Sequence, residues 1–190
     1  MTHNIAIFAS GNGTNAQRIS EYFEKVQHIK VLLIITNNKT AFVIERAKQL
    51  NIPCIVFSKS ELEQSEILLK VLIDNKIDWI ILAGFLLKIP EHLIKAFPEH
   101  IINIHPALLP KYGGKGMYGD IVHKAVITNK EVESGITIHY VNEVYDDGKI
   151  IFQAKTSVDE NDTPETLARK IHQLEYEYFP MAIRNVIEAN

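Results

Sequence analysis

Short apolar runs alternate with amphipathic segments through the first half of the chain, and this alternation constrains the fold more than any other feature. Runs rich in Val, Ile and Leu occupy residues 5–10, 30–36, 53–58, 78–85 and 100–105, and a helical pattern separates each run from the next. Continuous apolar runs of this kind are typical of strands that crossover helices bury on both faces. The sequence therefore predicts an α/β fold with a doubly wound, mostly parallel sheet.

A hairpin and a long helix are expected to complete this fold. Residues 134–141 and 149–158 have the pattern of strands, and the Asp and Gly residues between them favour a turn. Thr163 followed by Pro164 is a favourable helix start, with an N-cap residue and a proline in the first turn. We expect a single Rossmann-like domain over residues 1–190, with a phosphate-binding half to about residue 100 and a catalytic half after it.

Composition and charge narrow the classes of partner. The chain has 190 residues, 46% hydrophobic and 23% charged, with a net charge of -3, so no broad positive field attracts nucleic acid or anionic lipid. No apolar stretch approaches the roughly 18 to 20 residues that span a bilayer, and the first residues lack a signal-peptide pattern. One cysteine permits no disulfide framework. We expect a cytoplasmic protein with small-molecule substrates and no nucleic-acid or membrane partner, either a monomer or a homodimer.

Residues 10–15, SGNGTN, follow the first predicted strand and open the first predicted helix. Gly11 and Gly13 allow the backbone to approach a ligand closely, and a helix N-terminus attracts anions, which predicts a phosphate site. Gly11-x-Gly13-x-x-Ala16 also fits the dinucleotide fingerprint, but residues 36–38 lack the acid that binds the ribose in such proteins. A sugar phosphate is the favoured ligand, and a glycine-rich turn without a ligand is the simpler alternative.

A polar pair interrupts the last apolar run. Asn103 and His105 are two residues apart and therefore share a strand face, and Pro106 ends the strand. Buried polar groups need partners, and open α/β sheets bind ligands at this end of their strands, which favours a functional role. Asp146 in the hairpin turn could raise the pKa of His105, although turn aspartates are common. His139 has the same ambiguity, and a structural or indirect role is favoured.

With these residues, the chain resembles the phosphoribosylglycinamide formyltransferases, folate-dependent enzymes of purine synthesis. The resemblance covers nearly the whole chain and rests on SGNGTN, LAGF at 82–85, NIHPALLPKY at 103–112, HYV and YDDG at the hairpin, and His172 and Glu175 in the last helix. It implies direct transfer of a formyl group from 10-formyltetrahydrofolate to the amine of glycinamide ribonucleotide. The histidines show no metal-ligand spacing, so no metal is expected.

The resemblance also implies a role for each matched residue. Asn103 and a protonated His105 would stabilise the oxyanion, and Asp146 would favour the imidazolium and relay a proton. The residues implied at the phosphate of the ribonucleotide are Gly13, Thr14 and Asn15. Those implied around the remainder of the ribonucleotide are Gly84, Asn103, His172 and Glu175. The residues implied at the pterin of the folate are Leu86, Leu87, Lys88 and Ile89.

Two features depart from the family pattern, and several alternatives stay open. Where the family often has an arginine near the folate, this chain offers Lys59, and the loop at 111–119 is longer and richer in glycine than the common KYPG form. A formyltetrahydrofolate hydrolase or a tRNA-formylating enzyme is expected to need a further domain. A sugar-nucleotide N-formyltransferase would not need the phosphate loop, and a non-catalytic nucleotide-binding module would use Asn103 and His105 only as satisfied polar groups.

Overall fold

The computed structural model describes residues 2–64 and 66–190, and within them seven strands form one sheet in the order β3-β2-β1-β4-β5-β6-β7. β1 pairs in parallel with β2 and β4, β2 pairs in parallel with β3, and β6 and β7 are antiparallel. The predicted mostly parallel α/β sheet with a terminal hairpin is confirmed. The strands are β1 His3–Phe8, β2 Ile29–Thr36, β3 Cys54–Val56, β4 Trp79–Leu82, β5 Ile101–His105, β6 Glu133–Tyr140 and β7 Ile150–Ser157.

The helices separate the strands as the apolar pattern predicts. They are α1 Thr14–Phe23, α2 Val43–Gln49, α3 Lys59–Gln64, α4 Glu66–Asp74, α5 Glu91–Ala96, α6 Asp120–Thr128 and α7 Pro164–Ala189. The expected start of the last helix is confirmed, because the Thr166 N–H donates to Thr163 Oγ1 at 3.3 Å, the bond of an N-cap.

The chain divides into two compact units, and the division falls inside β5. Unit 1 runs to Ile102 and includes Asn190, and unit 2 is Asn103–Ala189. Each unit is described by itself below. The expectation of a single domain over the whole chain stays a prediction.

Unit 1 contains the point where the direction of sheet growth reverses. From β1 the chain adds β2 and then β3 on one side, and it returns to add β4 on the other side of β1. Ile5, Ile7 and Phe8 of β1 are fully buried, as are Ile80 and Ile81 of β4. In open α/β sheets, ligands bind beyond the carboxyl ends of the strands at such a reversal.

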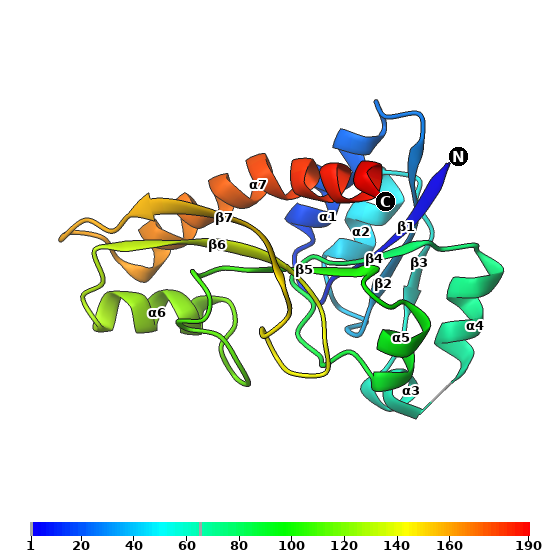
Figure 1. Cartoon of the computed structure of the whole chain (residues 1–190), viewed down its shortest axis with the longest axis horizontal. Helices are drawn as coiled ribbons and strands as arrows, with labels where there is room; N and C mark the ends of the chain where they lie inside the picture. Colours follow the sequence, from blue (N-terminus) through cyan, green and yellow to red (C-terminus); the bar gives the residue numbers. More distant parts are fainter. Residues whose placement is uncertain (1, 65) are drawn as a thin grey trace. The chain divides into compact units, whose positions relative to one another are not determined.

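Unit 2 is built on the β6–β7 hairpin and the long α7, which runs beside it and also contacts α6 (Figure 1). The buried face of α7 is apolar, with Ile171, Phe179 and Ile183 fully inaccessible to solvent. The connection between β6 and β7, residues 141–149, contains Asp146. The hairpin therefore supports this segment within the same unit as Asn103 and His105.

Candidate active site

The turn from β1 into α1 in unit 1 is where the sequence predicts a phosphate site. Gly13 is the N-cap residue of α1 and has a φ of 76°, in the left-handed region that favours glycine. A Cβ atom at Gly13 would lie 2.4 Å from Val43 Cγ2 and 2.9 Å from Val43 Cα, so the start of α2 packs directly on the turn. α1 begins at Thr14 and buries Asn15. The N-terminal end of a ten-residue helix, held rigidly in this way, suits a phosphate.

Arg46 of α2 belongs to this turn, although the sequence pattern does not single it out. Its Nε donates to the Asn12 carbonyl at 2.8 Å, its Nη2 donates to Asn12 Oδ1 at 2.8 Å, and its Nη1 bonds Gln17. These bonds join the middle of the turn to both α1 and α2. No spacing in the sequence connects residues 12 and 46, so only the structure reveals this arginine.

The segment after β4 lies against the same turn. The Ser10 N–H donates to the Gly84 carbonyl at 3.0 Å, and the Leu86 N–H donates to Ser10 Oγ at 2.9 Å. The Ser10 hydroxyl in turn donates to Asn37 Oδ1 at 2.5 Å. The structure thus brings together, within unit 1, the predicted phosphate turn and the predicted ligand residues that follow LAGF.

The four residues that the resemblance places at the folate differ in the surface that they offer. Leu86 is 50% exposed and Leu87 is half-buried, so both present apolar surface, and Lys88 is exposed. Ile89 is only 3% exposed and packs in the core of unit 1. Leu86 and Leu87 therefore fit the flat apolar face of a pterin, whereas Ile89 contributes chiefly by supporting them.

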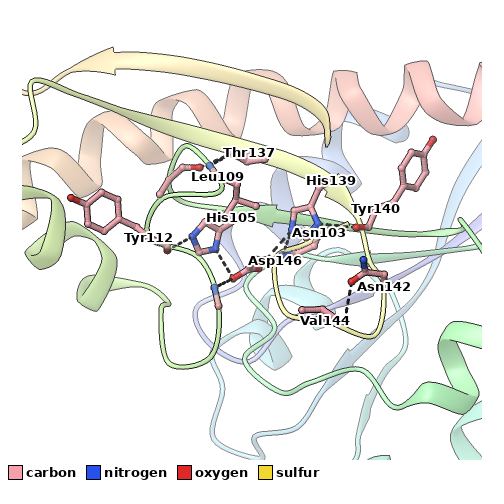
Figure 2. A network of polar contacts seen from close by, with 12 residues as sticks. Asn103, His105, Leu109, Tyr112, Thr137, His139, Tyr140, Asn142, Val144 and Asp146 are labelled. Carbon is pink, nitrogen blue, oxygen red and sulfur yellow. Dashed lines mark hydrogen bonds and ion pairs between the residues drawn. The ribbon is translucent and has the colours of Figure 1, made fainter. Parts of the chain in front are cut away.

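In unit 2, the structure brings His105 and Asp146 together, as Figure 2 shows. His105 lies at the end of β5 and is 3% exposed, and its Nδ1 lies 3.5 Å from Asp146 Oδ2. Asp146 has a φ of 54°, which only a few side-chain types such as Asp and Asn tolerate. The sequence nominates both residues, but forty positions separate them, and the β6–β7 connection makes the contact.

His139 of β6 orients the amide of Asn103. The His139 Nδ1 lies 2.8 Å from the Tyr140 carbonyl, which only accepts hydrogen bonds, so this nitrogen carries the proton. In the neutral ring, Nε2 is then an acceptor, and it receives an N–H of Asn103 Nδ2 at 3.0 Å. This bond uses one of the two N–H groups of the Asn103 amide and fixes the orientation of the amide. His139 Nε2 also lies 3.7 Å from Asp146 Oδ1, so one imidazole contacts both partners of the site.

The sequence leaves the protonation of His105 in the free protein open, and the fold supplies the groups that determine it. Burial lowers the pKa of His105 below its ordinary value, and the nearby charge of Asp146 and the hydrogen bond to Tyr112 offset this only in part. A lowered pKa favours the neutral ring near pH 7 in the free protein, and the protonated His105 implied for catalysis stays a prediction. Burial would raise the pKa of Asp146, but the His139 and His105 rings and the Gly114 N–H together lower it, so Asp146 is ionised.

The glycine-rich loop is bonded to both members of this pair. The His105 Nε2–H donates to the Tyr112 carbonyl at 2.7 Å, and the Gly114 N–H donates to Asp146 Oδ2 at 2.8 Å. A Cβ atom at Gly113 would lie 2.5 Å from Leu109 Cδ2 and 3.2 Å from Asp146 Cβ. The loop backbone thus lies directly against the site. Its expected mobility stays a prediction.

The remaining predicted ligand residues of unit 2 lie on α7. His172 Nδ1 lies 3.0 Å from Glu175 Oε2, and this hydrogen bond raises the pKa of His172. Glu175 is buried and interacts electrostatically with His105 and with His123 of α6. A buried carboxylate in these surroundings suits the hydroxyl groups of a sugar.

Thr137 is a further residue of the site that the sequence analysis missed. Its hydroxyl donates to the Ala107 carbonyl at 2.7 Å and accepts the Leu109 N–H at 3.0 Å, which holds the segment after β5 against β6. Gln153 of β7 reinforces it by donating to Thr137 Oγ1 at 2.9 Å. A signal was present, because Thr137 and His139 are two apart on a predicted strand and therefore share a face.

Metal binding, a cysteine nucleophile and membrane insertion were each considered for the described part of the chain. Over residues 2–64 and 66–190, no cluster of three or more His, Cys, Asp or Glu side chains is arranged to hold a metal ion. Burial raises the pKa of the half-buried Cys54 thiol, which argues against a nucleophilic thiolate there. None of the helices in the same ranges is both long enough and apolar enough to cross a bilayer.

The fold and these residues define a doubly wound α/β protein with a turn suited to an anion and an Asn-His-Asp cluster suited to acyl-group chemistry. The formyl transferase family model matches residues 3–183. The chain is 35% identical over 190 residues to phosphoribosylglycinamide formyltransferase of Bacillus subtilis (strain 168), covering 97% of this chain and 95% of that protein. The chain therefore belongs to the formyl transferase family, and the resemblance found in the sequence is confirmed.

Two further comparisons also give proteins named phosphoribosylglycinamide formyltransferase or glycinamide ribonucleotide transformylase. The chain is 42% identical over 190 residues to the chloroplastic phosphoribosylglycinamide formyltransferase of Arabidopsis thaliana, with 97% of this chain covered. It spans only 65% of that plant protein's length. The crystal structure of glycinamide ribonucleotide transformylase 1 from Geobacillus kaustophilus matches with a TM-score of 0.89 and 34% identity, covering 98% of this chain and 99% of that one.

Replacing Asp146 by asparagine should lower the pKa of His105 further, because the carboxylate charge is one of the groups that raise it. The imidazolium would then form only at a lower pH than in the unchanged protein. A ¹H-¹⁵N NMR titration of the histidine rings measures this directly. His172 serves as the internal control, since its pKa is raised by Glu175 and should not move. A His105 pKa that rises or stays constant would show that Asp146 does not tune this ring.

Proposed function

We propose that this protein transfers the formyl group of 10-formyltetrahydrofolate to the amine of glycinamide ribonucleotide. The observation that carries the proposal is the cluster of Asn103, His105 and Asp146 at the end of β5, in a chain whose relatives are named for formyl transfer to phosphoribosylglycinamide. Asn103 supplies a hydrogen-bond donor, His105 supplies a ring that can gain positive charge, and Asp146 supplies a fixed negative charge. Formyl transfer to an amine can use all three.

The bond changes of the proposed reaction indicate what the polar groups of the cluster must do. A bond forms between the substrate amine and the formyl carbon, the formyl oxygen gains negative charge, and the bond from this carbon to the folate nitrogen then breaks. Asn103 donates the N–H that is not bonded to His139 to the developing oxyanion. One proton leaves the attacking amine and one arrives on the departing folate nitrogen, so no covalent enzyme intermediate and no redox partner are needed.

His105 acts as a neutral ring that gains charge during the reaction. Burial disfavours the imidazolium in the free protein, but a nearby oxyanion favours it, since an opposite charge within about 4 to 6 Å stabilises the charged form. The ionised Asp146, 3.5 Å from His105 Nδ1, then balances the ring and can pass the amine proton through water. In this proposal, the protonated His105 that the resemblance implies is formed only while the oxyanion is present.

The proposed ligand contacts are given for each unit by itself. In unit 1, the turn at Gly13 and Thr14 would bind the phosphate of the ribonucleotide, and Leu86 and Leu87 would contact the pterin of the formyl folate, which supplies the one-carbon group. In unit 2, Glu175 and His172 would bind the sugar or amide portion. Lys59 is exposed and ion-paired to Glu63 at 3.7 Å, and it remains the candidate for the folate tail.

A spectrophotometric assay of folate deformylation tests this function. Purified protein, glycinamide ribonucleotide and 10-formyltetrahydrofolate should give turnover that requires the nucleotide. Deformylation at the same rate without nucleotide would indicate a hydrolase instead, and turnover only with an amino-sugar nucleotide would indicate a sugar N-formyltransferase. No turnover with any acceptor, despite nucleotide binding, would indicate a non-catalytic module.

Location and assembly stay predictions. A cytoplasmic location and a monomeric or homodimeric state are expected from the sequence, and sedimentation of the purified protein measures the second. One relative is chloroplastic by name, so the location is to be measured in the cell of origin.

A further inference from the structure

Tyr112 is a loop residue whose backbone carbonyl and side-chain hydroxyl form hydrogen bonds with different parts of unit 2. Its backbone carbonyl accepts the His105 Nε2–H at 2.7 Å. Its hydroxyl, at the far end of the ring, donates to Glu131 Oε1 at 2.9 Å and accepts from Asn129 Nδ2 at 2.9 Å. Asn129 and Glu131 belong to the connection from α6 to β6, which is sixteen or more positions further along the chain than Tyr112.

The backbone of Tyr112 is held in a conformation that it would not adopt unaided. Its φ is 57°, in the left-handed region, which is unfavourable for a residue other than glycine. Such a conformation persists when surrounding contacts determine it. The contacts at the ring hydroxyl provide that anchor, and Lys111 adds a second one by donating to Glu131 Oε1 at 3.1 Å.

The carbonyl of Tyr112 determines which nitrogen of His105 carries the proton. Because a carbonyl only accepts, Nε2 keeps its hydrogen in the neutral ring, and the lone pair is on Nδ1, facing Asp146 at 3.5 Å. A proton that the ring gains during a reaction must therefore be added at Nδ1, beside the carboxylate. Without the carbonyl, the neutral ring could instead hold its proton at Nδ1 toward Asp146.

We infer that Tyr112, anchored by Glu131 and Asn129, is a positioning residue that sets the tautomer of His105. The inference rests on the proposed function only for its effect on catalysis, because the tautomer is a property of the free protein. The groups that act on His105 from other elements are Asp146, His139 and Glu175, together with His123 of α6. The Tyr112 carbonyl is the hydrogen-bond partner of Nε2 that the described residues provide, so the proton on this nitrogen depends on Tyr112.

The test compares Tyr112→Phe with Tyr118→Phe. Phenylalanine keeps the ring of Tyr112 but loses both hydrogen bonds at its hydroxyl, whereas Tyr118 is 46% exposed on the same loop and serves as the matched control. Ligand-free protein labelled with ¹⁵N at histidine gives the ring tautomers by NMR, and the His105 signals are assigned by their loss in His105→Gln. We expect Nε2–H in the unchanged protein and in Tyr118→Phe, and a mixture of tautomers with a lower His105 pKa in Tyr112→Phe.

Two variants of Glu131 separate anchoring from general stability. Glu131→Gln keeps an oxygen that accepts from the Tyr112 hydroxyl and should preserve the tautomer, whereas Glu131→Ala should behave like Tyr112→Phe. In the formyl-transfer assay, Tyr112→Phe should lower kcat about 3- to 10-fold and leave the KM for nucleotide within about twofold, the range expected when the neutral hydrogen bond from His105 to the Tyr112 carbonyl is lost.

Several outcomes decide the inference. An unchanged His105 tautomer in a folded Tyr112→Phe, or equal changes in Tyr118→Phe, would overturn it. If Tyr112→Phe does not fold, Asn129→Ala removes one of the two hydroxyl contacts and must shift the tautomer in the same direction. If the unchanged protein shows no formyl transfer, the proposed function fails, and the NMR result still decides the role of Tyr112.

Discussion

Replacing His105 by alanine should lower kcat for formyl transfer by about 10²- to 10³-fold, the usual cost of removing one group that stabilises an oxyanion. The imidazole is the group that gains charge as the formyl oxygen becomes negative, and it is 3% exposed, so no water can easily replace it. The KM for nucleotide should change little, because the phosphate is assigned to residues in unit 1. Steady-state kinetics with each substrate varied in turn separates the two parameters.

The control is His100→Ala, because His100 also lies beside a backbone carbonyl, with its Nδ1 2.7 Å from that of Pro98, but belongs to unit 1. This variant should keep near-normal kcat. Thermal melts of both variants are needed, since His105→Ala leaves Asp146 with fewer partners and should lower the melting temperature modestly. Asn103→Ala should also lower kcat strongly. The fold-loss of kcat in the double variant should be smaller than the product of the two single fold-losses, because both residues act on one oxyanion. Near-normal kcat in folded His105→Ala would exclude the proposed role.

Gly13→Ala should raise the KM for nucleotide about 10- to 100-fold, because hydrogen bonds to a charged group are worth about 1.5–3 kcal/mol each and the phosphate turn would lose at least one. The new Cβ would lie 2.4 Å from Val43 Cγ2 and 2.9 Å from Val43 Cα, so the turn or the start of α2 must shift. The φ of 76° adds strain for alanine. Overpacking of this kind also destabilises a protein, typically by about 1–3 kcal/mol.

Gly11→Ala is the matched control, since a Cβ atom there meets no other atom within 4 Å. Calorimetric titration with glycinamide ribonucleotide alone should show weakened binding for Gly13→Ala and near-normal binding for Gly11→Ala. The rate at saturating nucleotide should be largely retained in both. Equal losses in the two variants would mean that the turn needs flexibility throughout, and that our assignment of the contact to Gly13 is mistaken.

Much of the fold could be predicted from the sequence, because strands and helices follow from local patterns of apolar and polar residues. Apolar runs of strand length between amphipathic segments are buried on both faces wherever they occur, and the structure confirms the strands, the hairpin and the start of α7 at Pro164. The sequence also nominated Asn103, His105 and Asp146, since polar residues in a buried strand need partners, and the structure brings the three close together. Their catalytic roles stay predictions. Arg46, Tyr112 and Thr137 escaped notice because each acts through a bond to a distant backbone or side-chain atom.

The charge of His105 shows most clearly where sequence reasoning ended. Spacing suggested a histidine with an acidic neighbour, and a neighbour alone would raise its pKa. The structure added burial, which lowers the pKa by more than Asp146 restores. Desolvation depends on every group packed around the ring, so no local pattern can report it.

The class of sheet, the family and the chemical types at the site could be read from the residues and their periodicity. Which atoms meet became known only from the fold. The Gly13 turn contacts Val43 and is bonded to Arg46, Asn103 is bonded to His139, and His105 lies between Asp146 and the Tyr112 carbonyl. Proton positions and pKa values depend on distances of about an ångström and on burial. Those quantities exist only once the chain has folded.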